Sequence, residues 1–524
     1  MISFVKKRMD WVIVFAALAV YMAHSMVFIN WIIDDAGVTY SYARNLVHGY
    51  GLVSQPGMPP VEGYSDFLWL VMLAPFFKLG IFHPVFIPKL LAAVLVSFTF
   101  LLLYRTSLSL TGSKALSALP PLCLALNTSF VVWTASGLEN SLYALLLTAA
   151  FHLLIKRPSH EGLYMGALVA LVGLTRPEGV AYFIVYPLVL AYRHVFEGMD
   201  GRERARGSFI YLPAFLLIYG GYEVFRYMYF GDILPNTYYA KAASIASGVY
   251  LQGGGGVYKF MSLLMSIFGG FAPVALVVYP ILTAFLMRRR ECRGPLFLSF
   301  LFLTMSVSIY QVMPPDWMRE FRFATPVFIF VYMHLFLMLK YLADTIRLRP
   351  AIKSSALAVI ALSFIVSSAA MFHRRSDSYI ANPDTSFYGV AKMYYMFERY
   401  EEEAGIHGSS LLLTDIGGPL YYSSLKLYDM GMVCDRTVAR TLFRDKPKFY
   451  DYVFEKIKPT FIHIPTDSRA KWYEFDNDPR FRKDYAAVIE WKEQETGLPV
   501  GDYIRRDALK DAGTLDRLRE LWKK

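Results

Sequence analysis

The chain has 524 residues, of which 55% are hydrophobic and only 18% charged, and its mean hydropathy is +0.36. A single soluble core cannot hide so much apolar surface, so lipid must be its solvent. The net charge of +11 does not indicate a nucleic-acid partner, because Lys and Arg cluster in short loops between apolar runs.

The first apolar run is Trp11–Ile33, and it follows the basic residues Lys6, Lys7 and Arg8. It is too long for the core of a signal peptide and lacks a small-residue cleavage site. A helix needs about 20 apolar residues to cross about 30 Å of hydrocarbon. We therefore expect an uncleaved first membrane span.

Further apolar runs predict an α-helical multi-pass membrane protein of about eleven helices. In chain order, the later runs are Val85–Tyr104, Ala115–Ala135, Leu138–Ile155, Leu163–Thr175, Val180–Tyr192, Phe209–Tyr222, Phe260–Leu286, Leu296–Val312, Pro326–Leu339 and Ala356–Met371. Two short crossings meet near Arg176, where Pro177 and Gly179 are suited to break a helix.

The apolar run Asp66–Ile81 decides the topology. If it lies along the membrane surface, the basic loops, including Arg202–Arg206 and Arg288–Arg290, all fall on the side of the N-terminus. If it crosses, they land on the wrong side. The positive-inside rule selects the first option. We predict a cytoplasmic N-terminus, a first external loop at about residues 34–84, and a periplasmic or extracellular tail.

Two domains are expected, a transmembrane catalytic domain at 1–372 and a soluble non-cytoplasmic domain at 373–524. Leu411–Thr414 and Thr460–Ile464 have the pattern of short buried strands, while Phe387–Glu403 and Leu509–Lys523 have helical periodicity. The tail is therefore predicted to be a small mixed α/β domain.

Two adjacent carboxylates, Asp34 and Asp35, follow the first span, where they are costly unless solvated or used. Asp35 could cap a helix that continues through Ala36 and Tyr40. Alternatively, one carboxylate is a general base toward an acceptor hydroxyl and the other positions it. If Asp35 is the cap, Asp34 is freer to face a cavity. We predict Asp34 as the base and leave the reverse assignment open.

External arginines beside apolar runs could bind a lipid phosphate through paired hydrogen bonds, or extend from a span end to the surface. They are Arg44, Arg176, Arg319 and Arg322. Arg176 is the strongest candidate, because the thirteen residues before it form only about 20 Å of helix. Arg176 should then lie below the membrane surface and contact the donor phosphate or pair with Glu178.

Glu139 and Asp316 lie in external loops near the tryptophans Trp133 and Trp317. Sugars are held by carboxylates and aromatic faces, although an interfacial Trp is also the ordinary membrane anchor. Asp232 lies in a predicted turn, where an Asp commonly stabilises the backbone.

Several motifs between about residues 30 and 330 occur in an order that resembles one superfamily. They include Ile33-Asp34-Asp35-Ala36, Val61-Glu62-Gly63-Tyr64-Ser65, Ser136-Gly137-Leu138-Glu139, Leu174-Thr175-Arg176-Pro177-Glu178-Gly179, Tyr229-Phe230-Gly231-Asp232-Ile233-Leu234-Pro235-Asn236-Thr237-Tyr238-Tyr239-Ala240-Lys241 and Asp316-Trp317-Met318-Arg319-Glu320-Phe321-Arg322-Phe323. The chain resembles the membrane glycosyltransferases of the GT-C superfamily. Within it, the chain resembles the mycobacterial terminal arabinofuranosyltransferases and their bacterial relatives.

This resemblance implies inverting transfer of a sugar from a polyprenyl-phosphate donor, on the non-cytoplasmic face of the cell membrane, with a first-loop Asp as base. Arabinofuranose is the first candidate for the sugar, and the acceptor would be a glycan, a lipid-linked molecule or a protein. The expected substrate-binding residues beside Asp34 and Asp35 are Arg44, Glu62, Tyr64, Glu139, Arg176, Glu178, Asp232, Asn236, Lys241, Asp316, Trp317, Arg319 and Arg322.

The alternative from another class is a secondary transporter or flippase of a lipid-linked or sugar substrate. Such a protein should have two corresponding halves with interrupted helices at the membrane midplane. Here the polar motifs collect on one face and no repeat is visible. No cofactor is expected, and no His and Asp cluster indicates a metal site. Arg alone could neutralise a lipid phosphate, so metal dependence is left open.

Overall fold

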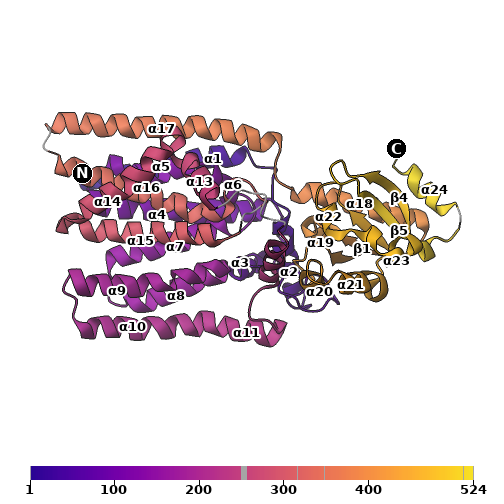
Figure 1. Ribbon diagram of the computed structural model, residues 1–524. Helices are drawn as coiled ribbons and strands as arrows, with labels where there is room; N and C mark the ends of the chain where they lie inside the picture. Colours follow the sequence, from indigo (N-terminus) through magenta and orange to yellow (C-terminus); the bar gives the residue numbers. More distant parts are fainter. Residues whose placement is uncertain (1, 249–255, 315–316, 347–348, 512, 523–524) are drawn as a thin grey trace.

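The computed structural model describes residues 2–248, 256–314, 317–346, 349–511 and 513–522. The molecule is elongated, with a helical bundle at one end and an α/β tail at the other (Figure 1). Buried apolar side chains form one continuous cluster from the bundle into the tail, through Tyr40, Phe387 and Leu420. This cluster joins the two parts of the chain.

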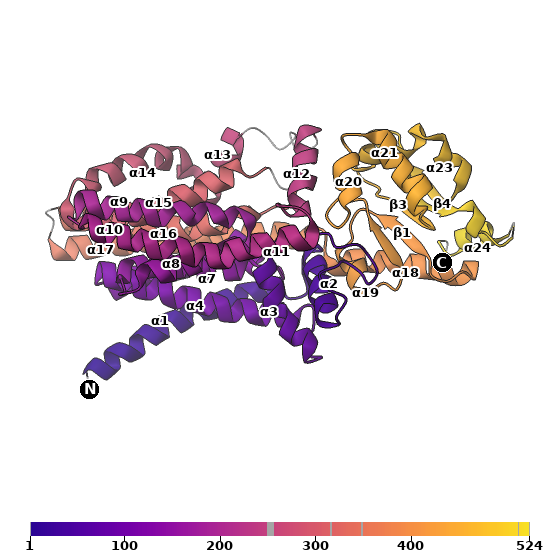
Figure 2. The same ribbon diagram turned by 90° about the horizontal axis from the view of Figure 1, so that it is seen from below.

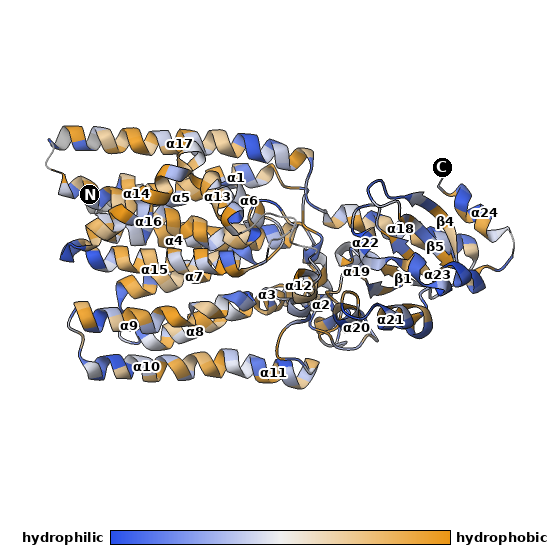
Figure 3. Cartoon of the chain, viewed as in Figure 1, coloured by the Kyte–Doolittle hydropathy of each residue, from blue (hydrophilic) through white to orange (hydrophobic). Residues whose placement is uncertain are grey.

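Mostly apolar helices of 7 to 32 residues build the bundle. They are α1 (Ile2–Met26), α4 (Phe86–Thr111), α5 (Lys114–Ala125), α6 (Thr128–Thr134), α7 (Asn140–Lys156), α8 (Glu161–Thr175), η1 (Pro177–Ile184), α9 (Val185–Phe196), α10 (Gly201–Phe215), α11 (Gly221–Phe230), α13 (Gly256–Phe268), α14 (Ala272–Met287), α15 (Arg290–Val312), α16 (Thr325–Thr345) and α17 (Pro350–Ala381). Hydrophobic residues cover much of these helices (Figure 3).

Among the described helices, seven are long and apolar enough to cross a membrane, or eight if α5 and α6, bent by 64°, form one span. The shorter apolar helices Asp10–Met26, α7 and α8 would raise eight to the eleven expected. Helix α3 (Phe67–Lys78) has 12 residues, about 18 Å, which is too short for the hydrocarbon core. The chain is a multi-pass membrane protein.

The two ends of the bundle differ in their neighbours. The N-terminus and the connection between α9 and α10, near the Arg202–Arg206 cluster, lie at the end far from the tail (Figures 1 and 2). The tail covers the opposite end. This arrangement agrees with the relative placement of basic loops and polar motifs that the positive-inside rule predicted.

A five-stranded mixed sheet, in the order β2-β1-β3-β5-β4, organises the tail. The first three strands are parallel, and β5 is antiparallel to both β3 and β4. The strands are β1 (Ser410–Leu413), β2 (Lys426–Asp429), β3 (Phe461–Ile464), β4 (Tyr485–Lys492) and β5 (Pro499–Arg505). The prediction of a mixed α/β domain in the tail is confirmed. Two of its strands, β1 and β3, were also predicted from the sequence.

Helices surround this sheet. They are α18 (Phe387–Ala404), α19 (Gly417–Tyr422), α20 (Arg436–Thr441), α21 (Lys446–Asp451), α22 (Ala470–Tyr473), α23 (Pro479–Asp484) and α24 (Thr514–Glu520). Two helices matter for the contact with the bundle, because α18 follows α17 directly and α19 packs against α2 (Asp35–Val47) of the first loop.

Candidate active site

A cavity of about 620 Å³ is lined by residues of both the bundle and the tail. Its bundle wall comes from the first loop, the start of α7, helix α12 (Asn236–Ala246) and the segment before α16. Its tail wall comes from the loops that follow β1, β2 and β3. The cavity therefore collects segments that are hundreds of residues apart in the sequence.

Helices α2 and α19 are joined by charged groups at both ends of α19, an arrangement we call the α2–α19 clasp. The carboxylate of Asp34 accepts hydrogen bonds from the amides of Gly417 at 2.9 Å and Gly418 at 2.7 Å. The guanidinium of Arg44 donates to the carbonyls of Leu420 at 2.9 Å and Tyr421 at 2.6 Å. An anion at the N-terminus and a cation at the C-terminus both complement the dipole of α19.

The clasp requires glycine on both helices, because their backbones approach closely. A Cβ on Gly417 would lie 1.8 Å from the carbonyl oxygen of Asp34, and one on Gly37 would lie 2.3 Å from the carbonyl oxygen of Gly417. Neither position can hold a side chain unless the backbones separate. The tail is thus seated directly on the first loop.

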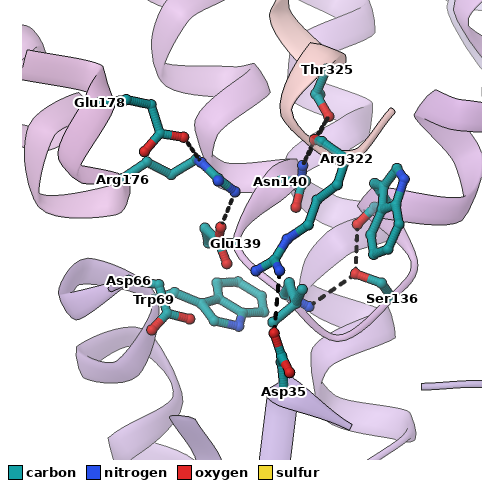
Figure 4. A network of polar contacts seen from close by, with 12 residues as sticks. Asp35, Asp66, Trp69, Ser136, Glu139, Asn140, Arg176, Glu178, Arg322 and Thr325 are labelled. Carbon is teal, nitrogen blue, oxygen red and sulfur yellow. Dashed lines mark hydrogen bonds and ion pairs between the residues drawn. The ribbon is translucent and has the colours of Figure 1, made fainter. Parts of the chain in front are cut away.

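The two neighbouring aspartates have different surroundings. Asp34 is buried, and burial, followed by repulsion from Asp415, raises its pKa well above the ordinary value. The side chain of Asp35 is 45% exposed, and one carboxylate oxygen lies 3.2 Å from Nη1 of Arg322 (Figure 4). Both line the cavity, but Asp34 is the residue held by backbone amides. The capping role expected for Asp35 therefore belongs to Asp34, and the capped helix is α19.

Arg322 reaches the cavity from a strained turn between α15 and α16. Glu320 and Phe321 have φ angles of 59° and 53°, a left-handed conformation that non-glycine residues rarely adopt. Glu320 holds this turn by pairing with Arg375 at 2.5 Å and by accepting a hydrogen bond from Trp133 Nε1 through its carbonyl at 2.8 Å. Trp133 is fully buried there and is not among the lining residues of the cavity, so its position is that of a residue that holds the turn.

Among the described residues, the guanidinium of Arg322 is left with unused hydrogen-bonding capacity. The residue is only 9% exposed, and its Nε has no partner among the residues that the structure describes. The second cation on the bundle wall is Lys241 of α12, whose Nζ lies 4.7 Å from the centroid of the Phe323 ring. These cations and Asp35 line the same cavity.

A buried chain of charges runs beside this cavity (Figure 4). Arg176 donates from Nε to Glu178 at 2.5 Å and from Nη1 to Glu139. The pairing with Glu178 expected from the sequence is present. Glu139 lines the cavity, whereas Arg176 and Glu178 are not among its lining residues. Arg176 is thus placed to orient Glu139.

Two of the expected binding residues instead connect the bundle to the tail. Asp232 pairs with Arg436 at 2.7 Å and with Arg440 at 2.6 Å, both on α20. The side-chain amide of Asn236 donates to the carbonyls of Met432 and Val433 at 2.8 and 2.9 Å. Neither residue lines the cavity. Arg44 belongs with them, because it forms the clasp.

Two others hold local structure. Glu62 is buried and accepts hydrogen bonds from Tyr222 at 2.6 Å and Arg226 at 2.7 Å. Arg319 pairs with Asp384, in the segment between α17 and α18, at 2.9 Å. Tyr64 and Trp317 do line the cavity. Asp316 lies outside the described residues.

The cavity also contains polar residues that sequence reasoning missed. Asp66 is buried, accepts a hydrogen bond from Thr39 Oγ1 at 3.0 Å, and has a pKa raised to about 8 by burial and, secondarily, by Glu139. The tail supplies Asp415, Asp467, Arg469 and Trp472. Asp66 looked like the start of an apolar run, and the tail residues follow short strands without a recognisable motif.

The cavity is lined by the cations Arg322 and Lys241 and by several carboxylates, among them Asp35, Asp66 and Glu139. Within the described parts of the chain, no group of three His, Cys, Asp or Glu side chains is arranged to hold a metal ion. Arg322 and Lys241 together present several N–H donors, which suit a phosphate group where water is scarce.

No family sequence model matches the chain, and no curated protein matches it by sequence. Solved structures match its fold. ArnT from Cupriavidus metallidurans bound to undecaprenyl phosphate has a TM-score of 0.57 at 12% identity, over 95% of this chain and 98% of that one. AglB, an archaeal oligosaccharyltransferase from Archaeoglobus fulgidus in complex with an inhibitory peptide and a dolichol-phosphate, has a TM-score of 0.53 at 12% identity, over 95% and 74%. The likeness shows a shared fold, and it agrees with the predicted α-helical multi-pass bundle with a C-terminal α/β domain.

Proposed function

We propose that this protein is a membrane glycosyltransferase that takes its sugar from a polyprenyl-phosphate donor. The observation that carries the proposal is a single cavity, at one end of a membrane-spanning bundle, that is lined by the carboxylate Asp35 and the cations Arg322 and Lys241. The polyprenyl phosphates in the ArnT and AglB complexes support this class of donor. Arabinofuranose is the first candidate for the sugar, from the sequence resemblance alone.

The donor phosphate would bind on the bundle wall. Arg322 is buried there and has an Nε without a partner among the described residues, so an anion would satisfy a donor that is otherwise costly to bury. Lys241 adds a second positive charge on the same wall. An arginine fork can hold a phosphate through two parallel hydrogen bonds, which also fixes the orientation of the leaving group.

The reaction needs one base and one stabilised leaving group. Asp35 would accept the proton of an acceptor hydroxyl as that oxygen attacks the anomeric carbon. The bond between the anomeric carbon and the phosphate oxygen breaks, and its electron pair leaves with the polyprenyl phosphate. Arg322 and Lys241 would stabilise the developing negative charge. Attack opposite the leaving group inverts the anomeric centre, and Asp35 returns its proton to water.

The position of the cavity favours transfer over transport. A secondary transporter binds its substrate near the membrane midplane, between repeated halves with broken helices. Here the cavity lies at one end of the bundle. The tail covers it, and the α2–α19 clasp holds the tail in place. A fixed cover of this kind suits a site where an acceptor meets a donor.

The test is an assay of the purified protein in lipid nanodiscs with a panel of polyprenyl-phosphate sugars, including arabinofuranose, another pentose and a hexose. We expect release of polyprenyl phosphate together with a glycosylated acceptor, and loss of both in Asp35→Asn. If the protein instead moves an intact lipid-linked sugar across vesicle membranes without releasing phosphate, the proposal is wrong.

A further inference from the structure

The tail wall of the cavity is built at a particular place in the sheet. The lining segments Thr414–Gly417 and Asp467–Arg469 follow the parallel strands β1 and β3, which are neighbours. The chain leaves β1 toward β2 on one side, and leaves β3 toward β4 and β5 on the other. The crevice between two such connections, at the carboxyl ends of the strands, is where open α/β sheets bind ligands.

Two carboxylates in this crevice are fixed by one arginine, and we call these three residues the Asp–Arg–Asp group. Arg469 donates from Nη1 and Nη2 to the two oxygens of Asp415 at 2.7 and 2.9 Å, and from Nε to Asp467 at 3.0 Å. The group carries a net charge of −1. Each carboxylate oxygen keeps further acceptor capacity, because an ionised carboxylate has about four lone-pair sites.

An aromatic ring accompanies the Asp–Arg–Asp group. Trp472 of α22 lines the same cavity and is partly exposed. Its ring makes an edge contact with Phe443 at 5.7 Å between centroids. An aromatic face beside two carboxylates held by one arginine matches a sugar, whose hydroxyls donate hydrogen bonds while its C–H groups pack on a ring.

The α2–α19 clasp places this crevice beside the proposed base. Asp415 is two residues before Gly417, whose amide binds Asp34, and Asp34 is the neighbour of Asp35. Carboxylates line both walls, Asp34, Asp35, Asp66 and Glu139 on the bundle side and Asp415, Asp429 and Asp467 on the tail side. The cations Arg322 and Lys241 are on the bundle side, whereas the cation of the tail wall, Arg469, is paired with Asp415 and Asp467. A phosphate is therefore favoured next to Arg322 and Lys241 and disfavoured next to the Asp–Arg–Asp group.

We propose that the loops after β1 and β3 form the acceptor subsite and that it binds the hydroxyl groups of an uncharged sugar. Asp415 and Asp467 accept hydrogen bonds from those hydroxyls, and Trp472 packs against the sugar ring. The net negative charge disfavours acceptors that carry phosphate or uronate groups. The role of this subsite in acceptor binding rests on the proposed glycosyl transfer, whereas its binding of a neutral sugar does not.

The first test is a binding measurement on the full chain in nanodiscs, by calorimetry, with a neutral arabinose oligosaccharide, a neutral mannose oligosaccharide and a uronate oligosaccharide. Asp467→Asn is the variant of choice, because its side chain is half exposed and lies outside the clasp. The matched control is Asp476→Asn, which also removes a carboxylate paired with an arginine, Arg482, but does not line the cavity.

We expect the wild type to bind a neutral oligosaccharide more tightly than the uronate. Asp467→Asn should raise the Kd for the neutral oligosaccharide about tenfold. Trp472→Ala should do the same in preparations that retain the wild-type Tm. Asp476→Asn should not change it, and undecaprenyl phosphate should bind all four proteins equally. Equal sugar affinity in Asp467→Asn and wild type, or tighter binding of the uronate, would overturn the proposal.

The second test separates this inference from the proposed function. In the transfer assay, Asp467→Asn should raise the acceptor KM while the donor KM stays the same. If transfer occurs and the acceptor KM of Asp467→Asn is that of the wild type, the subsite is wrong and the glycosyltransferase stands. If no donor is used but Asp467→Asn still weakens neutral-sugar binding, the proposed function fails and the sugar site stands.

Discussion

At the scale of single residues, Asp34 and Asp35 show how neighbours in sequence can serve different purposes. Asp34 is bound by two amides of the tail, whereas Asp35 is half exposed beside Arg322. The structure therefore favours Asp35 as the base, which reverses the preference drawn from the sequence. In the proposed mechanism, Asp34 is then a positioning residue that acts through α19.

The two aspartates should differ in what their loss does. Asp35→Asn should fold and bind the donor but lower turnover by about 10²–10⁴-fold, the usual cost of losing a general base. Asp34→Asn should lower the Tm, because the amide nitrogen of Asn cannot accept one of the two hydrogen bonds from α19 and leaves a buried N–H unsatisfied, at a cost of about 1–3 kcal/mol. Turnover and Tm of both variants, measured side by side, check this. A turnover defect confined to Asp34→Asn would restore the original assignment.

Arg176 and Arg322 offer a second comparison. Arg176 lies between Glu139 and Glu178, and breaking a buried ion pair costs about 3–5 kcal/mol. Lysine keeps the charge but cannot bridge both carboxylates. Arg176→Lys should therefore lower the Tm with the donor KM nearly unchanged, and Arg322→Lys should raise the donor KM with a smaller change in Tm. If Arg176→Lys alters the donor KM alone, Arg176 contacts the phosphate after all.

Asp66 makes stability depend on pH. Its pKa is about 8 in the folded protein, chiefly because of burial, against an ordinary value of 3.8. Between these values the folded state holds one more proton than the unfolded state, so the free energy of unfolding falls as pH rises from about 4 to about 8. Asp429, with a pKa raised to about 7, adds to this trend. Asp66→Asn should reduce the slope of Tm against pH, and an unchanged slope would contradict the prediction.

At the scale of elements, the long helices agree with their sequence patterns because each apolar run satisfies its own backbone hydrogen bonds. The break at Pro177 also occurs where expected, with η1 between α8 and α9. The pairing of α2 with α19 has no comparable local signal. Only the glycines Gly37 and Gly417 mark it, and glycine has many other uses.

The α2–α19 clasp should be sensitive to a single methyl group. Gly417→Ala would place a Cβ 1.8 Å from the Asp34 carbonyl oxygen, and the two backbones would have to separate. We expect the tail to loosen, seen as faster limited proteolysis of the segment around Asn382 to Thr385, together with lost transfer activity. Gly408→Ala is the control with open space around its Cβ, although its φ of +69° adds local strain. Equal cleavage in Gly417→Ala and wild type would show that the clasp does not hold the tail.

At the scale of the whole molecule, the basic connection near Arg202 and the tail lie at opposite ends of the bundle. A membrane between them would leave the tail and the cavity on one side. The three cysteines are buried, so cysteines introduced at exposed positions can be labelled against a low background.

Topology can be measured with Ser208→Cys in α10 and Ser468→Cys in the tail, both at exposed positions. A membrane-impermeant thiol reagent should label Ser468→Cys in intact cells and Ser208→Cys only after permeabilisation, because loops rich in Lys and Arg stay in the cytoplasm. The unmodified protein is the control. Labelling of both positions from the same side would contradict the topology and make α3 a possible crossing.

By itself the sequence determined the membrane-embedded class, the order of the helices and the end of the bundle at which polar motifs gather. Hydropathy and loop charge act locally and along the chain, so these features follow from short segments. Only the tertiary structure decided which aspartate is bound by backbone amides of the tail, because the amide that binds Asp34 belongs to Gly417, 383 residues away. The same holds for Asp232, Asn236 and Arg44, expected at the substrate but used to seat the tail. The partner of a charged side chain depends on which distant backbone approaches it, and no local pattern records that approach.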